Sequence, residues 1–329
     1  MDKKRLVALI LIFIVQIIYG LNYTFANDVI DGNFIKPYGF ILLRVFGATC
    51  LFWLLSLITP KEKIEKKDFI KLFVASIFGI ALNMLMFFKG FQYTTPIHAS
   101  VIMIITPIIV LILSAFFLNE RITASKILGV ILGFSGAVFL SVYGKSAQAG
   151  DNVLLGNFLV FVNAASFSVY IVLIKKLTAK YHPFTFIKWL FLFGLILVLP
   201  FGYSELMEVE WKSFNTYITF SVLFVIVCST FLNYLLNPIG LRHLKASTVS
   251  SFIYLQPVVA VIFAIIMKSD TFDWVKLISS ILIFTGVYLA TLRPKLKWNI
   301  YRFSSCFSSI LFGQGFVIES FRKLKRQFQ

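Results

Sequence analysis

Leu82–Gly90 reads LNMLMFFKG, and Leu232–Gly240, 150 positions later, reads LNYLLNPIG. The similarity continues without a gap through residues 82–140 and 232–290. Leucine and isoleucine matches arise easily by chance in an apolar chain, whereas Asn, Pro and Gly each have a separate polar or backbone reason to recur. The recurring residues of these types are Asn83 with Asn233, Gly90 with Gly240, Pro107 with Pro257, and Gly136 with Gly286. The sequence therefore predicts a fold made of two similar halves.

The chain around this repeat is too apolar for a water-soluble domain. Of its 329 residues 59% are hydrophobic and 14% are charged, and the mean hydropathy is +0.89, whereas soluble domains have about 45–50% apolar and about 25% charged residues. Continuous apolar runs of roughly 20 residues indicate membrane-spanning helices rather than barrel strands. We predict an all-α polytopic membrane protein with ten transmembrane helices. The expected spans are Leu6–Ala26, Tyr38–Ile58, Phe69–Phe88, Ile97–Leu118, Ser125–Ser141, Leu154–Leu177, Phe184–Tyr203, Thr216–Ile239, Ser247–Met267 and Trp274–Leu292.

The charge of the chain predicts its orientation. Lys and Arg number 31 against 14 Asp and Glu, which gives a net charge of +17. Most of the basic residues fall in the loops and ends that lie on one side of the ten spans, and an excess of Lys and Arg marks the cytoplasmic side. We therefore expect a multi-pass protein of the bacterial cytoplasmic membrane with both termini in the cytoplasm. Because this placement explains the basic excess, we expect no nucleic-acid partner.

Each half contains five spans, and since five is odd, the second half enters the membrane from the opposite side. The predicted units are a first five-helix repeat at residues 1–143, an inverted second repeat at 144–292 and a basic cytoplasmic tail at 293–329. Inverted repeats are typical of carriers that work by alternating access. A channel or pore is the alternative, and an integral membrane enzyme is a less favoured one. Because no catalytic constellation or metal motif occurs, we expect no catalytic residues, no metal and no cofactor.

Spans four and nine carry similar motifs. They are YTTPIHAS at Tyr93–Ser100, LNER at Leu118–Arg121, GLRHLKAS at Gly240–Ser247 and YLQP at Tyr254–Pro257. In order, spacing and duplication these motifs resemble the EamA-type members of the drug/metabolite transporter superfamily, over roughly residues 6–292. The resemblance implies ten helices, internal termini and movement of small metabolites, often the export of amino acids or related compounds. Members commonly carry Glu before the proline of spans four and nine, where this chain has Thr106 and Gln256.

Polar residues inside the spans are the candidate solute-binding residues, because such groups face the bundle interior or a water-filled cavity. We select Asn22, Tyr23, Arg44, Asn83, Thr106, Asn163, Tyr170, Asn233, Tyr234, Tyr254 and Gln256. The Asn83 and Asn233 pair fits either a cavity wall or plain interhelical hydrogen bonding, which is worth about 0.6 kcal/mol. Pro107 and Pro257 fit a hinge or a structural kink. Spans five and ten contain few polar residues, so we expect them to pack outside the pathway.

Three charged or titratable features remain. Arg44 is the basic residue that lies well inside a span, and it either attracts a carboxylate-bearing solute or snorkels and pairs with a carbonyl. His98, near the outer end of span four, is either proton-sensitive or a hydrogen-bonded residue at a helix start. The tail at residues 299–329 mixes aromatic residues with the cluster Arg322–Arg326, which suits a helix on anionic lipid or a partly disordered segment.

Overall fold

The computed structural model describes residues 3–59, 62–94, 99, 102–142, 152–267 and 273–292. Its regular elements in this part of the chain are all helical. Within the described residues, eight helices are long and apolar enough to cross a membrane, and two shorter apolar helices, Thr106–Phe117 and Ala124–Leu140, lie at the fourth and fifth expected spans. The prediction of an all-α polytopic membrane protein is confirmed.

The first half contains α1 (Lys3–Asp31), α2 (Pro37–Ile58), α3 (Lys66–Ser76), the π-helix η1 (Ile77–Ala81), α4 (Leu82–Phe91), α6 (Thr106–Phe117) and α7 (Ala124–Val142). The second half contains α8 (Val153–Lys180), α9 (Pro183–Met207), the 3₁₀ turn η2 (Trp211–Ser213), α10 (Thr216–Phe224), the π-helix η3 (Val225–Leu232), α11 (Asn233–His243), α12 (Ala246–Ser251), the 3₁₀ turn η4 (Phe252–Tyr254), α13 (Leu255–Ile266) and α14 (Trp274–Thr291).

The helices begin where the sequence supplies start signals. Pro37 and Pro183 occupy the first turns of α2 and α9, where the missing N–H is not needed and the fixed φ suits a helix. Asn152 accepts a hydrogen bond from the N–H of Leu155, at 3.1 Å, and so caps α8. A side-chain cap of this kind satisfies one of the backbone donors that a helix start leaves free.

Spans three and eight, which carry the repeat, are interrupted at matching places. The π-helix η1 comes directly before α4, which contains Asn83, and η3 comes directly before Asn233. Spans four and nine are interrupted as well, since a turn at Ile104–Ile105 precedes α6 and the 3₁₀ turn η4 precedes α13. These breaks place Pro107 and Pro257 in the first turn of a helix, where a proline is tolerated.

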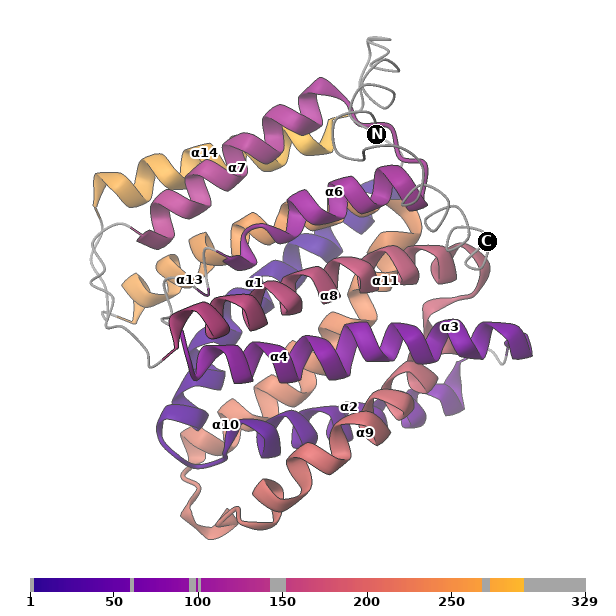
Figure 1. Cartoon of the computed structure of the whole chain (residues 1–329), viewed down its shortest axis with the longest axis vertical. Coiled ribbons are helices and arrows are strands. Elements are labelled where there is room, and N and C mark those ends of the chain that lie inside the picture. Colours follow the sequence, from indigo (N-terminus) through magenta and orange to yellow (C-terminus); the bar gives the residue numbers. More distant parts are fainter. Residues whose placement is uncertain are drawn as a thin grey trace.

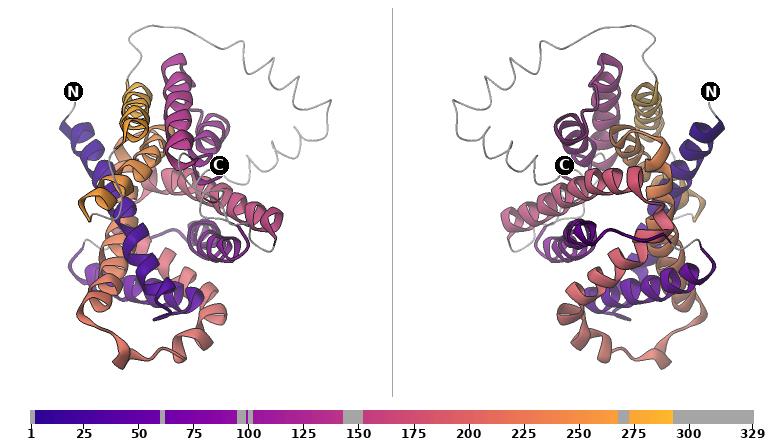
Figure 2. Two further views of the ribbon diagram at one scale, coloured as in Figure 1. Left: turned by 90° about the vertical axis from the view of Figure 1, so that its left-hand side faces the viewer. Right: turned by 90° about the vertical axis from the view of Figure 1, so that its right-hand side faces the viewer.

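The two halves are packed into one another. The first helix of the chain, α1, packs against α11 and α13 of the second half, and α8, which opens the second half, packs against α4 and α6 of the first. Figures 1 and 2 show α7 beside α14 at one edge of the bundle and α2 beside α9 at the opposite edge. Spans five and ten therefore pair with each other at an edge, away from the central helices.

The α7–α14 pair is close because its contact surface contains glycines. A Cβ added at Gly286 would lie 2.5 Å from the backbone N of Gly133, and one added at Gly129 would lie 2.6 Å from the carbonyl oxygen of Gly286. Small residues spaced four apart let helix backbones approach in a membrane. The glycines of the repeat thus have a packing role here.

The start of α1 and the end of α14 lie at the same end of the bundle. The Arg5 guanidinium donates to the carbonyl oxygen of Thr291 at 2.5 Å. A chain that crosses the membrane an even number of times begins and ends on the same side, so this contact agrees with the ten expected spans.

Candidate solute-binding site

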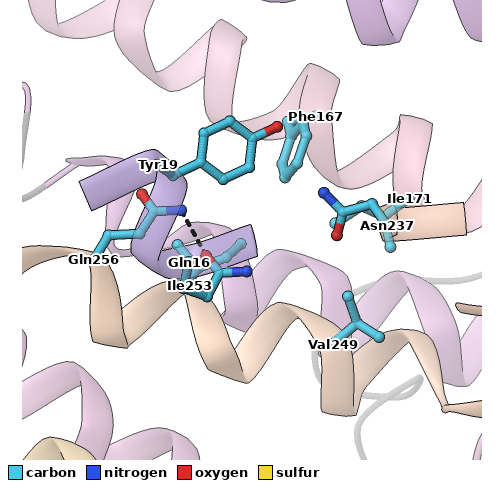
Figure 3. A pocket seen from close by; sticks show the side chains of 8 residues that line it. All are labelled: Gln16, Tyr19, Phe167, Ile171, Asn237, Val249, Ile253 and Gln256. Carbon is cyan, nitrogen blue, oxygen red and sulfur yellow. Dashed lines mark hydrogen bonds between the residues drawn. The ribbon is translucent and has the colours of Figure 1, made fainter. Parts of the chain in front are cut away.

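A small pocket lies between α1 of the first half and helices of the second half (Figure 3). Its volume of about 10 Å³ is enough for roughly one water molecule. Gln16 and Tyr19 line it from α1 of the first half, and α8, α11, α12, η4 and α13 of the second half supply the rest. The remaining lining residues are Phe167, Ile171, Asn237, Val249, Ile253 and Gln256.

Amide groups make up much of the polar surface of this pocket. Gln256 Nε2 donates to Gln16 Oε1 at 2.8 Å, which joins α13 to α1 across the two halves. The amide of Asn237 faces the same space from α11, and the Tyr19 hydroxyl points towards Phe167 (Figure 3). Of the eleven residues selected from the sequence, Gln256 is the one in this lining. The selection omitted the lining residues Gln16, Tyr19 and Asn237, although Tyr19 lies only three residues before the selected Asn22 in α1.

Arg44 of α2 is buried in the bundle, with 7% of its surface exposed. Its Nε donates to Thr230 Oγ1 at 2.9 Å. The Thr230 hydroxyl donates in turn to the carbonyl oxygen of Val225, at 2.8 Å within the π-helix η3. Among the described residues, no carboxylate pairs with Arg44.

Tyr170 of α8 and Tyr234 of α11 pack against each other beside the π-helix η1. Tyr234 donates its hydroxyl to the carbonyl oxygen of Gly79, at 2.8 Å in the π-helix η1. The rings of Tyr170 and Tyr234 have centroids 5.9 Å apart. A Cβ added at Gly79 would lie 2.2 Å from the Tyr170 ring, so this glycine makes room for that ring. The Tyr170 hydroxyl is buried without a hydrogen-bond partner, and so is that of Tyr254, which packs on Gly133.

The repeated asparagines have different environments. Asn163 Nδ2 donates to the Asn83 carbonyl at 2.5 Å, and Asn83 Nδ2 donates to the Asn163 carbonyl at 3.4 Å. This pair joins α4 to α8, so the described geometry of Asn83 is that of an interhelical contact. Asn233 is fully buried, yet neither of its side-chain amide atoms has a hydrogen-bond partner. The Asn22 side-chain oxygen is also buried without one.

At the start of α6, the Thr106 side chain replaces a backbone hydrogen bond that Pro107 cannot make. Because Pro107 has no N–H, it leaves the Met103 carbonyl oxygen, four residues earlier, without its helical donor. The Thr106 hydroxyl donates to that oxygen at 2.7 Å and replaces the missing bond. The structure describes only the backbone of Tyr23. His98 and the tail at residues 293–329 lie outside the described residues.

A second polar group, the Glu120 cluster, consists of Glu120, Lys126, Ala246 and Ser247. Glu120 Oε1 accepts a hydrogen bond from the N–H of Ala246, at the start of α12, at 2.6 Å. Its other oxygen accepts from the Ser247 hydroxyl and lies 3.4 Å from Lys126 Nζ. Lys126 also contacts the Ser247 hydroxyl. The Glu120 and Lys126 side chains are 8% and 6% exposed.

The loops on the same side as this cluster contain further ion pairs. Asp68 accepts hydrogen bonds from Lys180 at 2.5 Å and from Tyr181 at 2.8 Å, which ties α3 to the end of α8. Hydrogen bonds from Lys180 and Lys67 lower the pKa of the Glu65 carboxyl, which precedes α3. Burial, together with the nearby positive charge of Arg242, lowers the pKa of His182 between α8 and α9.

In the described part of the chain, no group of three or more His, Cys, Asp or Glu residues is placed to hold a metal ion.

Comparison with known proteins identifies the family. The sequence profile of the EamA-like transporter family matches twice, at residues 6–142 and 154–292. The chain belongs to the EamA-like transporter family. It is therefore an integral multi-pass membrane protein and a membrane transporter, and its EamA resemblance is confirmed.

Two relatives carry names that agree with this family. An "Uncharacterized transporter" of Archaeoglobus fulgidus is 30% identical over 271 residues, which cover 82% of this chain and 94% of the relative. The "Uncharacterized transporter YetK" of Bacillus subtilis is 26% identical over 70% of this chain and 71% of its own length. A solved structure described as "Crystal structure of protein" has a TM-score of 0.72 over 86% of this chain and 96% of that one, at 15% identity. That similarity shows the fold alone.

Proposed function

We propose that the chain exports a small organic metabolite, an amino acid or a related compound, by alternating access. The observation that supports this most directly is the position of the amide-lined pocket. Gln16 of the first half and Gln256 of the second half are joined across it. A relative movement of the halves would break this link and open the pocket, as expected of an inverted-repeat carrier.

The pocket is smaller than a metabolite, so binding requires the surrounding helices to move. The helices around it are not continuous, because η1 and η3 interrupt spans three and eight, and η4 interrupts span nine. Bulges and 3₁₀ segments are places where helices bend and where hinges occur. The proposed hinge residues are Pro107, which follows the turn at Ile104–Ile105, and Pro257, which follows η4.

Counterflow in proteoliposomes tests this proposal. The vesicles are loaded with one amino acid of a panel, and uptake of its labelled form is measured. A carrier shows trans-stimulated uptake, whereas a pore does not. We expect Gln256→Leu to reduce counterflow and Gln92→Leu, at an exposed position at the end of α4, to leave it unchanged. Uptake without trans-stimulation would favour the pore, and inside-out vesicles that do not accumulate the solute would contradict export.

A further inference from the structure

We propose that the Glu120 cluster is a lock that closes the transport pathway on the side of the membrane where α1 begins. This inference rests on the proposed carrier function and assigns gating residues to it. The cluster joins the turn between α6 and α7, in the first half, to the start of α12, in the second half. Its two parts would therefore separate when the carrier opens on that side.

Among the described residues, four contacts of the cluster run between the halves. Glu120 accepts the N–H of Ala246 at 2.6 Å and the N–H of Ser247 at 3.4 Å. The Ser247 hydroxyl contacts both the Glu120 carboxylate and the Lys126 ammonium group. Ser247 is 3% exposed, and the two charged side chains are almost as deeply buried. Separating a buried charge from its partners is costly, so these contacts favour the state in which the two parts touch.

The start of α12 lies between the cluster and the pocket. Val249, three residues after Ala246, and Ile253 of η4 both line the pocket. A Cβ added at Gly240, near the end of α11, would lie 2.5 Å from Ile12 in the first part of α1. The cluster is therefore at the end of the bundle where α1 begins. Because η4 interrupts span nine, α12 can tilt apart from α13, and such a tilt would open the pocket to that side.

The repeat shows that the opposite side cannot build the same lock. The charged pair recurs at the 150-residue offset, but the two donors of α12 are replaced. Proline has no N–H and isoleucine has no hydroxyl, so the two shortest links to the carboxylate have no counterpart there. The corresponding residues are Glu120 with Asp270, Lys126 with Lys276, Ala246 with Pro96, and Ser247 with Ile97.

The second half also provides a different partner for its lysine. Asp273 lies 3.1 Å from Lys276 Nζ, within the same turn of the chain. The residue at the equivalent position of the first half is Thr123, which has no charge. An exchange of conformations between the halves would therefore break the lock on one side without forming an equal one on the other. The state that is closed at the Glu120 cluster is thus favoured in the absence of solute.

Thiol labelling of a pocket residue tests the inference without knowledge of the solute. The reporter is Val249→Cys in a background in which Cys50, Cys228 and Cys306 are replaced by alanine. A charged, membrane-impermeant thiol reagent is added to sealed vesicles of either orientation, and the labelling rate from each side is measured. We expect Glu120→Gln to raise the rate from the side where α1 begins by about tenfold or more, and not to raise the rate from the opposite side.

Two further variants separate gating from loss of structure. Ser247→Ala removes the hydroxyl that both charged groups contact but keeps the N–H of Ala246, so it gives a smaller increase on the same side. Lys67→Gln is the matched control and leaves both rates unchanged. It removes an ion pair with Glu65 that lies at the same end of the bundle, within the first half, and is exposed. General loosening of the fold would raise the labelling rate from both sides.

The inference is overturned if Glu120→Gln and Ser247→Ala leave the labelling rate unchanged, or if the rate rises equally from both sides. Counterflow distinguishes this failure from failure of the carrier proposal. Trans-stimulated exchange by the wild-type protein, together with unchanged labelling in both variants, would leave the carrier in place and refute the lock alone. Absence of trans-stimulated exchange for every solute of the panel would refute the carrier proposal instead.

Discussion

The Glu120 cluster makes a sharp prediction about stability. Glu120, in the turn between α6 and α7, receives the N–H of Ala246 at the start of α12 and lies beside Lys126 of α7. Since both charged side chains are almost fully buried, neither charge is well solvated by water. The cluster therefore joins the fourth, fifth and ninth spans at one end of the bundle.

The change that isolates the charge is Glu120→Gln. The glutamine keeps an oxygen that accepts from the Ala246 N–H, so the start of α12 remains capped. Lys126 loses its carboxylate neighbour, and loss of one partner from a buried ion pair costs about 3–5 kcal/mol. Lys126 Nζ and the Glu120 carboxylate are 3.4 Å apart and lie at a helix end rather than in the deepest part of the bundle. We therefore expect the free energy of unfolding to fall by about 2–3 kcal/mol. That loss of unfolding free energy lowers the unfolding temperature by about 3–4 °C for a chain of 329 residues.

Thermal unfolding in detergent, with a double-mutant cycle, measures this effect. Lys126→Met alone leaves Glu120 without its cation, and the double variant should be at least 1 kcal/mol more stable than the sum of the two single effects predicts. The matched control is Glu208→Gln. Its partner Lys36 is only 2.5 Å away, but the two side chains are 57% and 62% exposed, and exposed pairs contribute about 0–1 kcal/mol. Equal shifts for Glu120→Gln and Glu208→Gln, or an additive cycle, would refute the reasoning.

The remaining predictions concern packing, amides and pH. Gly286→Leu should separate α7 from α14 and lower the unfolding temperature by several degrees, because even a Cβ there would lie 2.5 Å from the Gly133 nitrogen; an unchanged temperature would contradict this packing. Asn83→Leu should lower the free energy of unfolding by about 0.6 kcal/mol. Asn233→Leu should be neutral or stabilising, because the Asn233 amide is buried without partners. Thermal unfolding in which Asn233→Leu is the less stable variant would contradict both expectations. The lowered pKa of Glu65 implies a stabilising contribution that is present above its unfolded pKa of about 4.3 and is lost as pH falls through its folded pKa. The difference in unfolding temperature between wild type and Glu65→Gln at pH 7 should therefore disappear near pH 2, and a difference that persists there would contradict it.

Most of the fold was predictable from the sequence because apolar runs and their lengths are local properties. The fourth span is the informative exception. Hydropathy predicts a continuous helix through Pro107, but the described helix begins at Thr106, because a proline is better accommodated in a first turn than in a helix interior. The π-helices η1 and η3 had no sequence signal of this kind, since an inserted residue in a helix leaves hydropathy unchanged.

The site was less predictable because polarity alone does not say which partner a side chain finds. Gln256 lines the pocket and Arg44 is buried, and both were selected as polar residues within spans. Thr106 instead donates to a carbonyl that its own proline neighbour leaves free. Tyr19 was overlooked because a tyrosine in a chain with 17% aromatic residues carries little information until its neighbours are known.

The two repeated asparagines show how similar sequences acquire different roles in this fold. Each half packs its third helix against the first helix of the other half, so Asn83 meets α8 whereas Asn233 is on the helix that meets α1. No side-chain amide of α1 pairs with Asn233, whose two amide atoms are buried without a hydrogen-bond partner among the described residues. The reciprocal bonds of Asn83 therefore have no counterpart at Asn233. If the halves exchange conformations during transport, the two end states are stabilised by different hydrogen bonds, so their free energies differ and the carrier favours one of them in the absence of solute.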